Sequence, residues 1–159
     1  MDERVNVMSV VASFALAADA LRWNDLRAML APEVVLDYTS LFGGEARTTP
    51  REDIIAGWQE LLPGFTHTTH LIGAVRVAIT GGSAYVEAPV MAWHAIHDES
   101  ASNDRWVVGG RYEMQLAQQS GQWCISALTL ADAWVDGNSG LPEAARQRVR
   151  DGRGRQSEG

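Results

Sequence analysis

The chain has 159 residues, 46% of them hydrophobic, and a net charge of −7. That length suits one domain with a core and a pocket, and the composition is too apolar for a disordered chain. A single cysteine, Cys124, excludes an internal disulfide and a thiolate metal cluster. The absence of lysine excludes Schiff-base catalysis and a Walker-type phosphate loop.

Charge and targeting patterns restrict the partners. The last 19 residues hold five arginines against three acids, which leaves −9 for the remainder. An acidic body argues against nucleic acid, because phosphate binding needs a basic face. No apolar run is long enough for a membrane span, and the N-terminus lacks a basic segment followed by an apolar one. We therefore expect a cytoplasmic protein with neither membrane nor nucleic acid as its partner.

The first third of the chain predicts helices around one strand. Ala- and Leu-rich residues 4–22 predict a helix, and a second short helix follows and ends before Pro32. Residues 33–42 predict a strand and 43–50 a loop. Thr49 and Pro50 suit the start of a third helix, which runs to residue 62.

After residue 64 the pattern changes to strands joined by short turns. The predicted strands are 67–79, 84–97, 105–118 and 122–135. Helices followed by consecutive strands indicate an α+β fold, in which a curved antiparallel sheet and three N-terminal helices form a cone-shaped α+β barrel around a pocket. We assign 1–140 to this domain and 141–159 to an arginine-rich tail, either a short helix or a disordered, solvated end.

Strand geometry separates the four histidines. Residues three apart on a strand point to opposite faces, so only one of His67 and His70, and one of His94 and His97, can face a pocket. His94 shares its face with small apolar residues and is the inward candidate. His70 faces inward only if a bulge at Gly73 shifts the strand by one residue. The apolar face of that run otherwise consists of Leu71, Val75, Val77 and Ile79.

Asp19 supplies a carboxylate that an inward histidine could meet. It extends an apolar stripe of the first helix formed by Val5, Met8, Ala12 and Ala15. A carboxylate there is costly unless a donor satisfies it, and an Asp–His pair is a general base. Tyr38 could donate a hydrogen bond to a substrate oxygen. The pattern leaves open that Asp19 pairs with Arg22, and that the histidines and Tyr38 are only core residues. A zinc site would need further ligands, so we expect no metal.

Four segments resemble the SnoaL-like branch of the nuclear transport factor 2 superfamily, and most closely scytalone dehydratase and its bacterial relatives. They are AADALRWNDLRAMLAPEVVLDYTS, HTTHLIGA, APVMAWHAIH and SGQWCISALTLADAW, which together span roughly residues 10–136. The resemblance implies an acid/base cluster of Asp19, His70 and His94. It implies that His70 removes the proton and that Tyr38 assists the departing water or hydroxyl, without a metal or organic cofactor.

The sequence departs from that family at three positions. Ala18 stands where the dehydratase has a second tyrosine, Gly110 where it has a serine, and Tyr112 where it has an asparagine. These changes leave the residues of the acid/base cluster in place. They do not decide whether the reaction is a dehydration, an isomerisation or a cyclisation.

Our hypothesis is therefore a cofactor-independent lyase or isomerase of the dehydratase type. Its substrate would be a hydrophobic cyclic molecule, polyketide- or steroid-like. The expected pocket wall consists of Leu41, Phe42, Trp58, Phe65 and Tyr112. The alternative is a non-catalytic ligand-binding or assembly module of the same fold, such as a dioxygenase small subunit. An outer sheet face with Tyr85, Met91 and Trp93 predicts a homo-oligomer, a dimer or a trimer.

Overall fold

The computed structural model describes residues 2–97 and 104–157. The helices are α1 (Glu3–Asp19), α2 (Trp23–Met29), α3 (Thr39–Phe42), α4 (Arg51–Gln59), the 3₁₀ turn η1 (Leu62–Gly64) and α5 (Leu141–Arg150). The strands are β1 (Leu30–Asp37), β2 (Arg47–Pro50), β3 (His67–Ile72), β4 (Arg76–Thr80), β5 (Ser83–Ala95), β6 (Arg105–Gln119) and β7 (Gln122–Gly137). None of these helices is long and apolar enough to cross a membrane.

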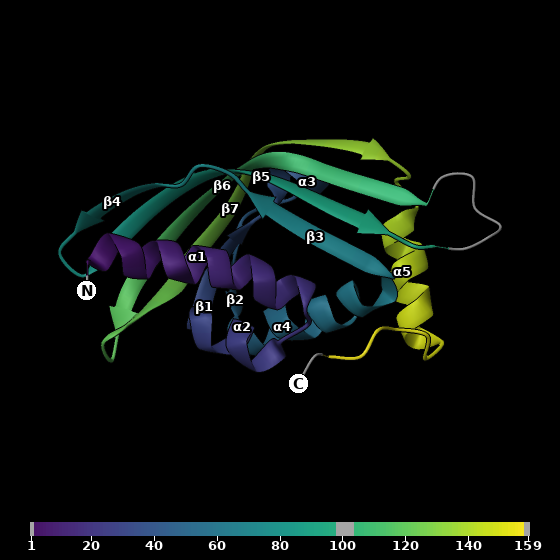
Figure 1. The fold of residues 1–159 in the computed structure, drawn as a ribbon, viewed down its shortest axis with the longest axis horizontal. Helices are drawn as coiled ribbons and strands as arrows, with labels where there is room; N and C mark the ends of the chain where they lie inside the picture. Colours follow the sequence, from purple (N-terminus) through teal and green to yellow (C-terminus); the bar gives the residue numbers. More distant parts are fainter. Residues whose placement is uncertain (1, 98–103, 158–159) are drawn as a thin grey trace.

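One curved sheet carries all seven strands and confirms the predicted α+β cone. The order is β2-β1-β7-β6-β5-β3, with β4 also paired to β5. Every pairing is antiparallel except that of β1 with β7. Helix α1 lies along one face of the sheet, with α2 and α4 beside it (Figure 1). The core fills the space between these helices and the sheet.

Helix α1 buries a different stripe from the predicted one. Val7, Val11, Phe14 and Ala18 are buried, at the spacing of a core-facing helix stripe. Of the stripe that we singled out in the sequence, Ala15 is buried, whereas Val5 and Met8 are exposed. The helix is so rich in apolar residues that two stripes look alike in the sequence, and contact with the sheet selects one of them. Asp19 is the last residue of the helix.

The segment from 30 to 50 differs from prediction in two ways. The predicted strand 33–42 ends at Asp37, and residues 39–42 form the helical turn α3. Asp37 Oδ1 accepts hydrogen bonds from the backbone N–H of Thr39 at 3.0 Å and from its hydroxyl at 2.6 Å, which favours the turn over an extended chain. The predicted loop 43–50 contains β2, which pairs with β1. Strand pairing of this kind is not visible in a short polar sequence.

The predicted strand 67–79 divides into β3 and β4 at the expected bulge. Ile72 pairs with Val90 and Arg76 with Glu87, so four steps on one strand face three on β5. This one-residue excess is the slip that we predicted near Gly73. It places His70 on the inner face with Val77. Leu71, which would face inward only in a strand without the slip, is 60% exposed and points outward.

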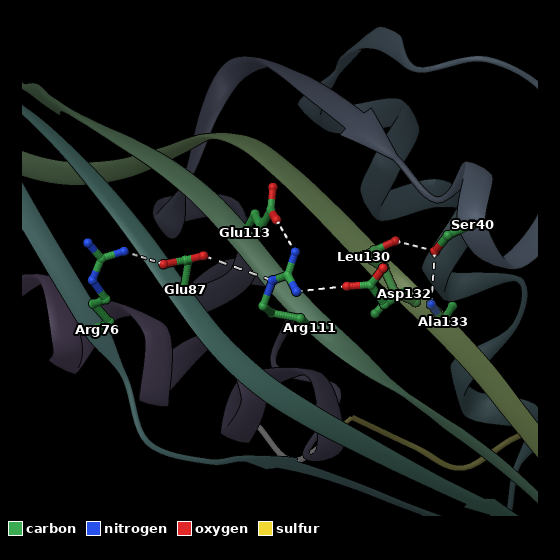
Figure 2. A network of polar contacts seen from close by, with 8 residues as sticks. All are labelled: Ser40, Arg76, Glu87, Arg111, Glu113, Leu130, Asp132 and Ala133. Atoms are coloured by element: carbon green, nitrogen blue, oxygen red, sulfur yellow. Dashed lines mark hydrogen bonds and ion pairs between the residues drawn. The ribbon is translucent and has the colours of Figure 1, made fainter.

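A second bulge, in β7, fixes α3 against the sheet. Two steps on β6, from Gly109 to Arg111, face three on β7, and Asp132 takes a left-handed φ of 52° there. Ser40 in α3 donates its hydroxyl to the carbonyl of Leu130 and accepts from the N–H of Ala133, across this bulge (Figure 2). Asp132 accepts from Arg111 at 2.7 Å. The bulge therefore anchors the turn that follows Tyr38.

One side of the C-terminal tail packs against the domain, while much of the rest is exposed. Helix α5 forms as one of the two predicted states, and it lies against η1 so closely that a Cβ on Gly64 would overlap the backbone of Ala145. Arg148 donates to the carbonyl of Gly64 at 2.8 Å. Beyond the helix, the N–H of Arg155 donates to the carbonyl of Pro63. Two of the tail's arginines, Arg148 and Arg155, thus donate to backbone carbonyls of the domain, whereas Arg150 and Arg153 pair with acids inside the tail.

Candidate active site

Asp19 and His70 form a doubly hydrogen-bonded pair. Asp19 Oδ1 lies 2.7 Å from His70 Nδ1, and Asp19 Oδ2 accepts the backbone N–H of His70 at 2.8 Å. Burial would raise the pKa of Asp19, but the hydrogen bonds and charge of His70 outweigh it and hold that pKa below its usual value. An ionised carboxylate only accepts hydrogen bonds, so Nδ1 of His70 carries a proton and neutral His70 presents the lone pair of Nε2.

The alternative partner for Asp19 is engaged elsewhere. Arg22 forms an ion pair with Asp25 at 3.5 Å. The side chains of Asp19 and His70 are 21% and 14% exposed, so the pair is largely shielded from solvent but keeps some accessible surface. Helix α1 delivers the carboxylate at its end, and strand β3 delivers the imidazole through the parity set by the bulge.

His94 lies beside this pair and stays neutral near neutral pH. Its ring centroid is 5.6 Å from that of His70, at 87°, and it packs between Phe65 and Trp106 at 4.8 Å from each. Burial, followed by the charge of His70, lowers the pKa of His94 to about 4. Nδ1 lies 3.1 Å from the carbonyl of Trp106, which can only accept, so Nε2 is again a lone pair. At neutral pH His94 is therefore a hydrogen-bond acceptor or a second base, and it cannot act as a proton donor.

Two tyrosines supply the donors of the site. The hydroxyls of Tyr38, just before α3, and Tyr112, on β6, are hydrogen-bonding partners. Burial raises the pKa of Tyr112 to about 12, and burial together with Tyr112 raises the pKa of Tyr38 well above its usual value. Both phenols are thus protonated at neutral pH. Tyr112 provides a second tyrosine although Ala18 occupies the position expected for one.

A cavity of about 390 Å³ joins His70, His94, Tyr38 and Tyr112, whereas Asp19 does not line it and acts on it through His70. Among the residues expected to act or bind, His70, His94, Tyr38, Leu41, Phe42, Trp58 and Tyr112 line it. Phe65 is fully buried behind the ring of His94 and does not line the cavity. Phe14 and Trp58 form an edge-to-face wall, with ring centroids 5.8 Å apart. The lining is mostly apolar and encloses few polar groups, as in sites for hydrophobic ligands.

The outward histidines lie where strand alternation places them. His67 is exposed and its Nε2 lies 2.8 Å from Thr69 Oγ1, and exposed His97 contacts Asp104. Within 2–97 and 104–157, no group of three or more His, Cys, Asp or Glu side chains could hold a metal ion.

Sequence reasoning missed one polar residue of this cluster. Thr68 is 4% exposed on the inner face of β3, and its hydroxyl hydrogen-bonds with Asp19, which contributes to the low pKa of that carboxyl. The parity argument that selected His70 also selects Thr68, two residues earlier on the same face. The signal was therefore present in the sequence.

Comparison with known proteins agrees with this architecture. The sequence profile of the SnoaL-like domain matches residues 1–129. No curated protein matches the chain. Among solved structures, the Kfla4162 protein from Kribbella flavida is similar, with 26% identity and a TM-score of 0.78, over 90% of this chain and 96% of that one.

Two further solved structures share the fold at lower identity. A candidate scytalone dehydratase from Novosphingobium aromaticivorans has 17% identity and a TM-score of 0.69, over 84% of this chain and 86% of that one. A hexachlorocyclohexane dehydrochlorinase, LinA type 2, has 10% identity and a TM-score of 0.65, over 87% and 90%. Both names describe eliminations. Identities this low show a common fold and leave the reaction of this chain to its own residues.

Proposed function

This chain belongs to the SnoaL-like domain family, and on that premise we propose that it is a cofactor-independent lyase or isomerase of the dehydratase type. One observation carries the proposal. His70, with its Nδ1 held at 2.7 Å from the Asp19 carboxylate, lines an apolar cavity and has Nε2 available as a base for a molecule bound there.

The reaction begins with proton abstraction by Nε2 of His70. The proton comes from a carbon next to a carbonyl or an activated ring, and the electrons of the broken C–H bond enter the substrate π-system. Asp19 stabilises the imidazolium that forms, because its carboxylate already accepts the Nδ1 proton. The low polarity of the cavity strengthens this ion pair relative to water.

The buried tyrosine pair stabilises the opposite side of the substrate. Tyr38 and Tyr112 share one hydrogen bond, so one of their two hydroxyl protons is left to donate to the oxygen on which negative charge develops. In an elimination, the new double bond forms as the C–O bond breaks, and the proton on His70 leaves with the hydroxide as water. In an isomerisation, the same proton returns to another carbon. His94, which is neutral, accepts a hydrogen bond from a substrate hydroxyl.

The substrate class follows from the cavity. About 390 Å³ of mostly aromatic and aliphatic wall suits a hydrophobic cyclic molecule, such as a polyketide- or steroid-like ring, with few polar substituents.

The test is hydrogen exchange at the acidic carbon of cyclic ketones. Candidate ketones are incubated with protein in D₂O, and deuterium uptake is followed by NMR, which detects the first step even when no product accumulates. We expect His70→Ala and Asp19→Asn to lower the exchange rate by about 10²–10⁴-fold, the usual contribution of general-base catalysis. His67→Ala is the matched control, since His67 lies on the same strand and faces outward.

Undiminished exchange by His70→Ala would refute the proposal. Ligand binding by the wild type without exchange or turnover would instead support the non-catalytic binding module. Binding is measured separately from the quenching of tryptophan fluorescence, since Trp58 and Trp106 line the cavity.

A further inference from the structure

Arg155 lies in the C-terminal tail, outside the region matched by the family profile, yet it contacts the elements that carry the site. Its guanidinium donates to the carbonyls of Phe65 at 2.8 Å, Asp19 at 3.1 Å and Leu62 at 3.3 Å, and to the hydroxyl of Thr68 at 3.1 Å. Asp19 ends α1, whereas the other three acceptors lie in η1, in β3 and in the short connection between them.

The contact with Asp19 completes the end of α1. The last carbonyls of a helix have no partner within the helix and favour a nearby cation. Helix α1 carries no basic residue in its last turn, so Arg155 supplies from the tail a donor and charge that the helix lacks. The backbone that positions the carboxylate of Asp19 is thereby held in place.

The contact with Thr68 reaches the carboxylate through one hydroxyl. The Thr68 oxygen accepts a hydrogen bond from Arg155, and this directs the single hydroxyl proton away from the guanidinium. The acceptor on that side is the carboxylate of Asp19, with which Thr68 hydrogen-bonds. The order of donors is then Arg155 to Thr68, Thr68 to Asp19, and His70 to Asp19 from the other side.

The tail is built to hold this arginine. The backbone N–H of Arg155 donates to Pro63 at 2.7 Å, and a Cβ on Gly154 would lie 3.2 Å from the side chain of Pro63. Arg148 donates to the carbonyl of Gly64, next to the same turn. A close-fitting glycine and two arginines thus fasten residues 148–155 to η1.

We propose that Arg155 is a positioning residue for the Asp19–His70 pair, acting through the Thr68 hydroxyl and the end of α1. This inference rests on the proposed function of the pair. It makes the C-terminal tail part of the active-site architecture, so that a chain cut before Arg155 would keep every cavity-lining residue and still have an impaired base.

The test compares Arg155→Ala, Arg155→Lys, Thr68→Val and the double variant Thr68→Val/Arg155→Ala in the full-length protein. Arg153→Ala is the matched control, because Arg153 lies in the same tail and its side chain pairs with Asp151. The first readout is the pKa of Asp19 from NMR titration of its ¹³C-labelled carboxyl, which needs no substrate. The second is kcat and KM for exchange at the substrate carbon.

We expect Arg155→Ala and Thr68→Val each to raise the pKa of Asp19, because each removes a donor from the relay. Each is expected to lower kcat by about tenfold with KM little changed, the usual scale for residues that orient an active-site group. The double variant should lose about tenfold and not a hundredfold, because residues of one network are not additive. Arg155→Lys retains the charge at the end of α1 but cannot make the four guanidinium contacts together, so it should recover only part of the loss seen in Arg155→Ala. Arg153→Ala should resemble the wild type.

An unchanged Asp19 pKa in Arg155→Ala, losses that add in the double variant, or an equal effect of Arg153→Ala would each overturn the proposal. If Arg155→Ala does not fold, Thr68→Val decides the relay, since it is isosteric and leaves the tail intact. The two proposals can fail independently. If the proposed function is wrong, His70→Ala retains hydrogen exchange at the substrate carbon. The NMR titration of Asp19 still reports whether Arg155 acts on that carboxyl.

Discussion

His94 should make this protein lose stability in mild acid. Its pKa is about 4 in the folded protein, against 6.5 for an ordinary histidine. The folded state therefore binds fewer protons than the unfolded chain between these values. The stabilisation is fully present above pH 6.5 and is lost as the pH falls towards 4. A difference of 2.5 pKa units corresponds to about 3 kcal/mol, and the group is only 5% exposed, so solvent screening reduces this little.

The assay is urea unfolding at a series of pH values from 7.5 to about 4.5, for the wild type and His94→Phe. Phenylalanine retains a ring between Phe65 and Trp106 and removes the titrating group. Loss of the hydrogen bond to the Trp106 carbonyl lowers stability at every pH, so the slopes are compared and not the absolute values.

We expect the wild type to lose about 2–3 kcal/mol more than His94→Phe across this range. His97→Gln is the control, since it removes an exposed histidine three residues further along the chain. Parallel pH dependences for the wild type and His94→Phe would refute the reasoning, because they would show that His94 is protonated in the folded protein as easily as in the unfolded chain.

Four further predictions follow from the fold and the tyrosine pair. Tyr112→Phe should lower kcat for exchange by about tenfold or more, because it removes one hydroxyl of the hydrogen-bonded pair and with it the proton left for the substrate; steady-state rates check this, and an unchanged kcat would contradict it. Ser40→Ala should lower the free energy of unfolding by about 1 kcal/mol, since it removes two hydrogen bonds to backbone groups at the β7 bulge; urea unfolding measures it. Gly73→Ala should cost about 1–3 kcal/mol, because its Cβ would lie 2.7 Å from the Pro89 ring; thermal unfolding that matches the wild type would refute the close approach. Trp93, 37% exposed on the outer sheet face, is expected at an interface between copies, so light scattering should report a dimer or trimer that Trp93→Arg weakens.

Local periodicity determined the arrangement of the histidines. Side chains alternate along a strand whatever its neighbours are, so His70 and His94 could be separated from His67 and His97 before any contact was known. Gly73 marked the bulge because a residue without a side chain is favoured where a strand shifts register. The same alternation contains Thr68, although its role emerged only with the partner on α1.

Tertiary packing determined what periodicity could not. The choice between two apolar stripes of α1 depended on contact with the sheet, and it decided where Asp19 lies. The helical turn of α3 depended on Asp37 and on a bulge some 90 residues away. The pairing of Tyr38 with Tyr112 joined residues that no local pattern connects.

The arginine-rich tail shows most clearly which features depend on the sequence alone and which depend on the tertiary structure. By itself the sequence determined the α+β fold, the basic end and the inward histidines, since these depend on composition and on the repeat of a strand or helix. Only the tertiary structure decided that Asp19 pairs with His70 and not with Arg22, and that Arg155 binds the end of α1. The physical reason is that a charged side chain selects its partner by proximity in space, and here the partners lie 51 and 136 residues away along the chain.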